Sequence, residues 1–200
     1  MVRKISLPAE PLRMVEGGSR LWSRVWKFVK SVISITIGAS PEPPQDLHKL
    51  SLVFCDVRHL LHIPSLFLSL NITNFPDLLR LPKSIDKLSK LKVLRLQACG
   101  TLKRLPQSMS QLSELRFLDI SYCSSLGAFP EGMEVLRRLE KIDMRSCSGI
   151  EELPPSLVQM ECLTKVICDE DGASLWISCG FDPSKLDVRR EEVDLRFLHG

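Results

Sequence analysis

The sequence lacks the short motifs that carry nucleotide, metal or nucleophilic chemistry. No G-x-x-x-x-G-K-[ST] phosphate loop occurs, so nucleotide binding is not expected. The seven cysteines include no C-x-x-C pair, and the four histidines show no spacing typical of a zinc site or of an activated nucleophile. We therefore expect no enzyme activity, no metal and no cofactor for this chain.

A long apolar run and a secretory signal are also missing. The one candidate for a membrane span, residues 20–37, is interrupted by Arg24, Lys27 and Lys30, whereas a span needs about 20 apolar residues. Because no secretory signal is evident, the cysteines, which are odd in number, are interpreted as reduced thiols. We place the chain in the cytoplasm, with the nucleus as the alternative.

What the sequence does contain is a 24-residue repeat. Three successive copies carry leucine-type residues, a cysteine and a proline at the same nine offsets. The pattern LxxLxLxxCxxL at a fixed period of about 20 to 29 residues is the signature of leucine-rich repeats. The nine positions are Leu91, Leu94, Leu96, Cys99, Leu102, Leu105, Pro106, Met109 and Leu112 in the first copy, Leu115, Leu118, Ile120, Cys123, Leu126, Phe129, Pro130, Met133 and Leu136 in the second, and Leu139, Ile142, Met144, Cys147, Ile150, Leu153, Pro154, Leu157 and Met160 in the third.

The repeat extends in both directions along the chain. Upstream, one further unit has Phe75 in place of the cysteine, and before it lies a shorter unit of 20 residues. Downstream, Leu163, Val166 and Cys168 begin a last half-unit. We divide the chain into a non-repeat segment (1–46), leucine-rich repeats over 47–168 (units 47–66, 67–90, 91–114, 115–138, 139–162 and 163–168) and an acidic C-terminal cap or tail (169–200).

Each unit is expected to supply one strand and one helical turn. Leu94 and Leu96 point inward and Arg95 outward, as strand alternation requires. A proline such as Pro106 suits the first position of a helical turn, because the N–H there has no partner within the helix. A single unit cannot bury its apolar face, and about three are needed. The sequence predicts an α/β solenoid, a leucine-rich-repeat horseshoe fragment with short parallel strands on the concave face and helical turns on the convex face.

Residues 1–46 do not fit the repeat. Apolar residues recur at helical spacing over 20–37, two of them tryptophans, with lysines and arginines elsewhere on the helical wheel. We interpret this segment as an amphipathic helix that caps the exposed core of the first repeat. A basic helix lying on a membrane surface is the alternative. The prolines within 41–44 are interpreted as part of a linker into the repeats.

Charge changes sign along the repeats. Residues 67–114 carry an excess of lysine and arginine, whereas residues 139–200 carry an excess of aspartate and glutamate. The basic residues between Arg80 and Arg95 are not interleaved with aromatic residues, and acidic residues lie nearby, so nucleic-acid binding is not expected. The acidic cluster at 169–171 is interpreted as solvated surface rather than as a cation site.

Candidate protein-binding residues occupy the outward positions of three adjacent strands, on the predicted concave face. Asp119 and Asp143 fall on neighbouring strands, which is mildly unfavourable. A cation from a protein partner relieves this repulsion, and so do Arg95 and Arg145 on either side; the sequence leaves both explanations open. The candidate set is Arg95, Gln97, Asp119, Ser121, Asp143 and Arg145.

Four stretches of the chain resemble a known family. They read LHKLSLVFC (47–55), LPKSIDKLSKLKVLRLQAC (81–99), LEKIDMRSCS (139–148) and LTKVICDEDGASLW (163–176). They are similar to the C-terminal leucine-rich repeats of plant intracellular immune receptors, in the helper subclass whose N-terminal coiled coil is of the powdery-mildew-resistance type. The tail DVRREEVDLRFLHG (187–200) resembles the end of that subclass as well.

The resemblance implies a role in plant defence signalling. The family's four-helix signalling domain and its nucleotide-binding switch are missing from this sequence, so we expect a truncated disease-resistance protein that acts as a repeat-only interaction module. Its partners are expected among lipase-like immune co-regulators or full-length immune receptors. Two alternatives stay open, namely a membrane-peripheral protein held by residues 20–37 and a gene remnant with no independent function.

Overall fold

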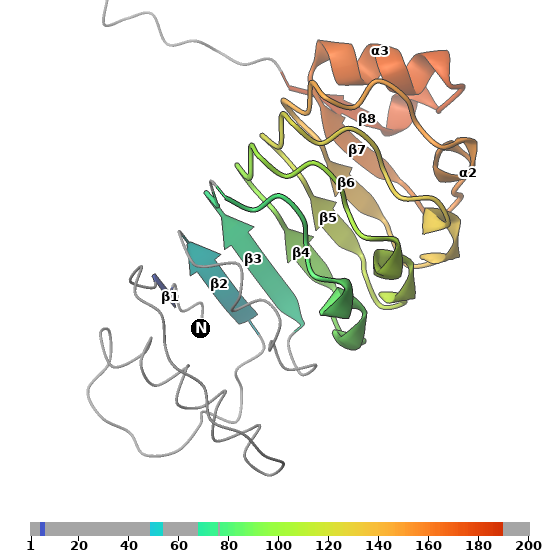
Figure 1. Cartoon of the computed structure of the whole chain (residues 1–200). Helices are drawn as coiled ribbons and strands as arrows, with labels where there is room; N and C mark the ends of the chain where they lie inside the picture. Colours follow the sequence, from blue (N-terminus) through green and yellow to red (C-terminus); the bar gives the residue numbers. More distant parts are fainter. Residues whose placement is uncertain (1–4, 7–48, 54–67, 76, 190–200) are drawn as a thin grey trace, which may run out of the picture.

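The computed structural model describes residues 5–6, 49–53, 68–75 and 77–189, and for the first two ranges it gives the backbone alone. In these residues one parallel sheet contains eight strands, which lie side by side in chain order (Figure 1). The strands are β1 (Ile5–Ser6), β2 (Lys49–Val53), β3 (Ser69–Thr73), β4 (Val93–Arg95), β5 (Phe117–Asp119), β6 (Lys141–Asp143), β7 (Lys165–Cys168) and β8 (Leu186–Val188).

The register of the sheet follows the 24-residue period. Each central leucine-type residue pairs with its equivalent in the next strand, because every repeat returns the chain to the same height. These side chains are completely buried and form a continuous apolar column under the sheet. The column consists of Leu70, Leu94, Leu118, Ile142 and Val166.

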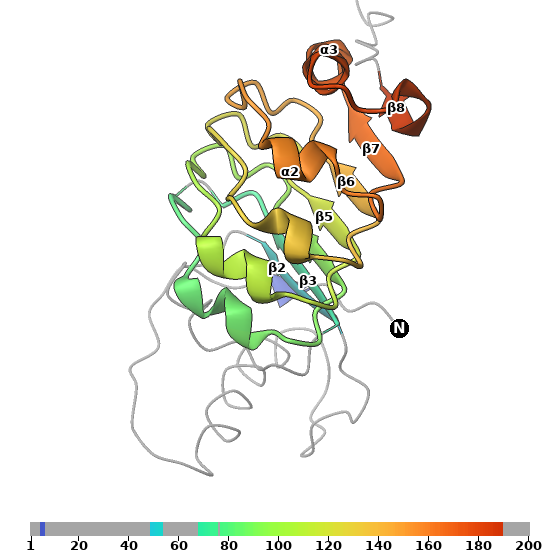
Figure 2. The same cartoon turned by 90° about the vertical axis from the view of Figure 1, so that its right-hand side faces the viewer.

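The other side of each repeat is a helical turn. Three 3₁₀ helices and one short α-helix stack in a column opposite the strands (Figure 2). Each presents one apolar side chain to the core, for example Met109 and Leu157. The turns are η2 (Lys83–Lys87), η3 (Gln107–Gln111), η4 (Met133–Val135) and α2 (Pro155–Val158).

Except before η4, the prolines of the repeat lie one residue earlier than the sequence suggested. Pro82 and Pro106 directly precede their helices, with φ of −65° and −72° and extended ψ, so they set the direction of entry rather than the first helical position. Among the four described helical turns of the repeats, α2 alone has a proline, Pro155, in the first turn itself. Before η4 the preceding residue is Gly132, whose φ of 74° is the left-handed conformation that glycine adopts without strain.

The repeated cysteine ties each repeat to the one before it. The thiol of Cys123 donates to the Leu96 carbonyl and that of Cys147 to the Ile120 carbonyl, both at 2.9 Å. Burial raises the pKa of the Cys147 thiol to about 12, so this group stays protonated at neutral pH. These side chains are therefore structural donors, and not thiolates suited to nucleophilic or metal chemistry.

The C-terminal segment is more ordered than a repeat count alone suggested. The sequence placed the last strand at 163–168, but helix α3 (Glu170–Ser178), a 3₁₀ helix η5 (Pro183–Lys185) and strand β8 follow it. Strand β8 is parallel to β7, so the chain adds one more strand to the same sheet.

Asp169 corrects our interpretation of the acidic cluster as only solvated surface. One carboxylate oxygen accepts a hydrogen bond from the Gly172 N–H at 2.9 Å, which caps the start of α3. The other oxygen accepts the Ser146 N–H at 2.8 Å. The first residue of the cluster thus joins the terminal helix to the preceding repeat.

At the N-terminal end, the described residues include strand β1, which lies in the segment that the sequence set apart from the repeats. It pairs with β2 in parallel and so belongs to the same sheet. The predicted capping helix over 20–37 and the predicted linker at 41–44 lie outside the described residues. Within the described ranges no helix is long and apolar enough to cross a bilayer.

Candidate protein-binding surface

The outward side chains of the strands form one continuous surface, which we term the concave face. Alternation along each strand places every second side chain on it. Its central row crosses the sheet through the paired positions of strands β3 to β8. The row consists of Asn71, Arg95, Asp119, Asp143, Ile167 and Asp187.

The structure brings the six candidate residues together. Arg95, Asp119 and Asp143 are register neighbours in the central row. The other three candidates, Gln97, Ser121 and Arg145, follow two residues later in each repeat. The interactions within this group differ from one strand to the next and decide which side chains are available to a partner.

Asp119 is held from two directions and is only 7% exposed. Its Oδ1 accepts hydrogen bonds from the Ser121 backbone N–H at 3.0 Å and from the Ser121 hydroxyl at 2.7 Å. Its Oδ2 lies 3.6 Å from Nε of Arg95. A buried carboxylate with these partners is already satisfied within the chain.

Asp143 is 4% exposed and is paired with Arg145. The guanidinium Nε and one terminal nitrogen each donate to a different carboxylate oxygen, both at 2.9 Å. The hydrogen bonds that Arg145 donates to Asp143 raise the pKa of the guanidinium, so Arg145 keeps its positive charge. Of the two explanations left open by the sequence, the structure shows the internal one, in which Arg95 and Arg145 compensate the adjacent aspartates. Neither carboxylate is open to a partner's cation.

Phe117 is a central part of the concave face that the candidate set omitted. The guanidinium of Arg95 lies 5.1 Å from its ring centroid, and the ammonium of Lys141 lies 4.9 Å from it. Both distances are within the range of cation–π interactions. Phe117 precedes Asp119 by two residues, so strand alternation places both side chains on the same face. The same alternation in the sequence would have predicted Phe117 as a residue of this surface.

The central row continues on both sides of the two aspartates with further polar and charged groups. Toward β3, a terminal nitrogen of Arg95 donates to the Asn71 side-chain oxygen at 3.3 Å. Toward β8, Asp187 lies 2.8 Å from Lys165 and 2.7 Å from Arg189, and these two cations lower the pKa of its carboxyl. Each of the three aspartates in the central row therefore has a cationic side chain beside it.

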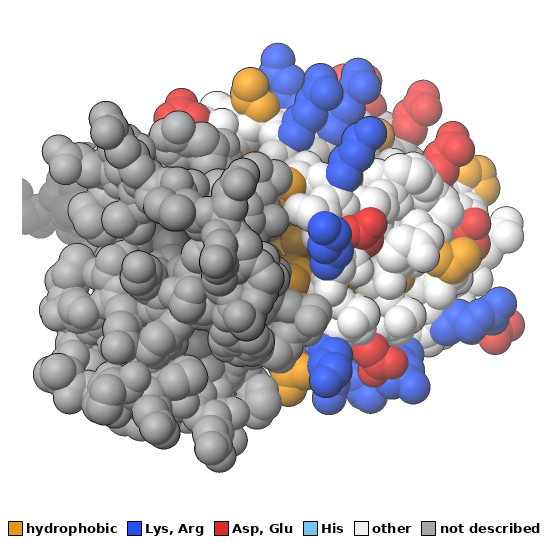
Figure 3. Space-filling view, turned by 60° about the horizontal axis from the view of Figure 1, so that its bottom comes forward, with side chains coloured by type: hydrophobic (Ala, Val, Ile, Leu, Met, Phe, Trp, Pro, Cys, Tyr) orange, Lys and Arg blue, Asp and Glu red, His pale blue; other side chains and the backbone are white. Residues whose placement is uncertain are grey.

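Lysine and arginine side chains also gather in groups at the edges of the described surface, with aspartate and glutamate beside them (Figure 3). Among the described residues, no group of three or more histidine, cysteine, aspartate or glutamate side chains is arranged to hold a metal ion. The chemistry that the concave face offers is recognition by an aromatic ring and by oriented guanidinium and ammonium groups.

Comparison with known proteins gives structural neighbours only. No protein-family model matches the chain, and no curated protein is significantly similar to it in sequence. The leucine-rich repeat domain of the type III effector XopL superposes with a TM-score of 0.51 and 26% identity, over 60% of this chain and 40% of that chain. A leucine-rich repeat protein of Leptospira interrogans gives a TM-score of 0.37 and 17% identity, over 68% of this chain and 50% of that chain.

This chain thus spans less than half the length of the XopL domain with which it superposes. The likeness agrees with the stacked parallel strands, the 24-residue register and the column of helical turns. The fold predicted from the repeat is confirmed: the chain is a leucine-rich-repeat solenoid with short parallel strands on one face and helical turns on the other.

Proposed function

We propose that this chain is a protein-interaction module that binds a protein partner through the concave face, centred on Phe117. The observation that carries the proposal is the half-buried phenyl ring between the side chains of Arg95 and Lys141. Aromatic residues and arginine are enriched among the residues that contribute most to protein interfaces. A partner that covers this ring removes apolar surface from water and desolvates the flanking cations.

The buried aspartates support this role indirectly. Asp119 and Asp143 hold Arg95 and Arg145 in defined orientations before any partner arrives. Orienting long side chains in advance lowers the entropy that binding otherwise costs. The two aspartates are positioning residues in this proposal, and the arginines and Phe117 make the contacts.

The resemblance to plant immune receptors gives the proposal its biological setting. We propose that the chain is a truncated disease-resistance protein that acts in plant defence by protein binding, without a nucleotide switch and without enzyme activity. The stretch 163–176, which carries much of the resemblance, forms β7 and most of helix α3. Lipase-like immune co-regulators and full-length immune receptors are the proposed partners, and the cytoplasm, with the nucleus as the alternative, is the proposed location.

The test is a binding titration of the whole chain against candidate lipase-like co-regulators. Phe117→Ala should weaken binding about 30-fold, the loss typical of a central interface aromatic. Val135→Ala is the matched control, because it also truncates an exposed apolar side chain (53% exposed) but lies on the convex side. Equal affinities of these two variants, with both chains folded by circular dichroism, would overturn the proposal.

A further inference from the structure

A second charged surface lies on the loops that join the strands to the helical turns. In successive repeats these loops stack like rungs, since the Lys103 N–H donates to the Leu79 carbonyl at 3.1 Å. Arg80 and Arg104 pair in a parallel β-bridge on the same rungs. We term these four residues the basic rungs. They are separate from the concave face, because they follow the strands and precede the helical turns.

The basic rungs concentrate positive charge. Residues paired in parallel have side chains on the same side, about 4.8 Å apart, so Arg80 and Arg104 project together from one surface. Within the part of the chain that the structure describes, neither arginine nor Lys103 forms an ion pair, and all three are exposed. Like charges at this spacing repel, and a bound carboxylate relieves the repulsion while using the forked geometry of each guanidinium.

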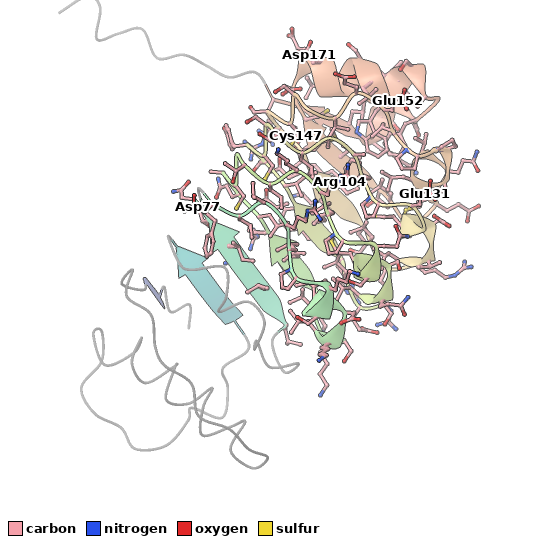
Figure 4. The ribbon with its side chains drawn as sticks, in the orientation of Figure 1. Asp77, Arg104, Glu131, Cys147, Glu152 and Asp171 are labelled. Carbon is pink, nitrogen blue, oxygen red and sulfur yellow. The ribbon has the colours of Figure 1, made fainter. Side chains whose placement is uncertain are left out.

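At the positions equivalent to the basic rungs, the charge is negative two repeats further along the chain. The equivalent positions are first Gly127 and Ala128 and then the exposed residues Glu151 and Glu152. Arg104 and Glu152 both lie on these loops (Figure 4). Within the repeats that the structure describes, the cationic part therefore covers two rungs. A nucleic-acid backbone continuing along the loops would meet the two glutamates, whereas a short acidic segment ends before them.

Leu79 distinguishes a peptide from other anions. Its side chain is 55% exposed and lies next to Arg80 in the chain. The basic rungs contain no aromatic ring on which a nucleobase can stack, which is the usual source of affinity for single strands. A peptide offers both features that the surface needs, namely carboxylates for the arginines and an apolar side chain to cover the leucine.

We propose that the basic rungs bind an acidic peptide segment of a protein partner. Carboxylates of that segment pair with Arg80 and Arg104, and an apolar side chain between them covers Leu79. Lys103 adds positive potential that favours the encounter and makes it sensitive to salt. The site works independently of Phe117, so a partner bound on the concave face is able to occupy it with a second segment.

The test is a nuclear magnetic resonance titration of the whole ¹⁵N-labelled chain with the peptide acetyl-Glu-Glu-Leu-Glu-Glu-amide. Amide shifts should localise to residues 79–80 and 103–104. The double variant R80Q/R104Q should bind about tenfold more weakly, as expected for the loss of two exposed ion pairs. The matched control K90Q/R137Q removes the same charge from two exposed positions outside the rungs and should change the affinity less than about twofold.

Several outcomes would overturn this site. Shifts that are absent from the rungs, or equal weakening by the two double variants, would mean that the peptide has no site there. A single-stranded oligonucleotide that binds more tightly than the peptide and depends on Arg80 and Arg104 would make the surface a nucleic-acid site instead. Phe117→Ala should leave peptide binding unchanged, so failure here and failure of the concave-face proposal are separate results.

Discussion

The indole N–H of Trp176 points at the thioether of Met144, with Nε1 and Sδ 3.0 Å apart. Trp176 also packs against Phe181, with ring centroids 4.6 Å apart. Both rings are buried and lie in the same apolar cluster as the repeats. Helix α3 thus closes the end of a core that a last repeat would leave open to water, which is what a terminal cap of a solenoid must do.

Removing the indole should therefore destabilise the whole solenoid. We expect Trp176→Ala to lower the free energy of unfolding by about 3–5 kcal/mol, the usual cost of truncating a buried aromatic residue. Urea unfolding followed by circular dichroism measures this. Ile177→Ala, next to it on the exposed side of α3, should change stability by no more than about 0.5 kcal/mol. Similar losses for both variants would mean that α3 does not cap the core.

The centre of the apolar column provides a second test of the fold. Leu118 is completely buried between Leu94 and Ile142, and Leu118→Ala should cost about 2–5 kcal/mol. Leu79→Ala is the matched control, because the same atoms are removed from a largely exposed side chain. A loss below about 1 kcal/mol at Leu118, on the scale of a surface substitution, would contradict its place in the core.

The buried thiols give the solenoid a pH dependence on the alkaline side. The pKa of Cys147 rises from 9.0 to about 12 because burial disfavours the thiolate. A raised pKa means that the folded chain holds the proton more tightly, so this contribution is complete below about pH 9 and is lost as the pH rises toward 12.

Unfolding in urea at a series of pH values, in the presence of a reductant, measures this loss. The slope due to Cys147 should reach about 1.4 kcal/mol per pH unit above pH 9. Cys147→Ala should show a correspondingly shallower slope, whatever its stability at neutral pH. Identical slopes for the wild-type chain and the variant would show that Cys147 titrates normally in the folded state.

The repeat pattern predicts the parts of the structure that depend on apolar periodicity. The leucine offsets locate the buried side of each strand, because a solenoid repeats its register every 24 residues. They do not predict Phe117, which lies on the solvent side and is not constrained by the core. They also do not predict the orientation of Asp143, because its pairing with Arg145 depends on side-chain geometry and not on the spacing of the leucines.

The ends of the solenoid depend on interactions that the period does not describe. Strand β8 follows helix α3, which interrupts the 24-residue repeat, so the leucine offsets do not predict this strand. Asp169 looks like one member of a solvated acidic run, but its carboxylate caps α3 and accepts the Ser146 N–H. An N-cap aspartate followed by acidic residues in the first helical turn is a recognisable local signal, and reading it in that way would have predicted the start of α3.

The turn after each strand allows a substitution that stabilises the chain. Ala98 has a φ of 56°, a left-handed conformation that costs a residue with a Cβ about 1–2 kcal/mol. Glycine removes that cost but increases the entropy of the unfolded chain by roughly 0.5–1 kcal/mol, so Ala98→Gly should gain about 0.5 kcal/mol in net stability.

Ala128→Gly is the matched control, because Ala128 lies in an exposed loop without a positive φ and should lose about 0.5–1 kcal/mol. Thermal and urea unfolding of both variants measure the difference. Because the two substitutions change the unfolded state in the same way, their opposite signs would report the backbone conformation at position 98 directly, and equal losses would mean that the turn is not left-handed there.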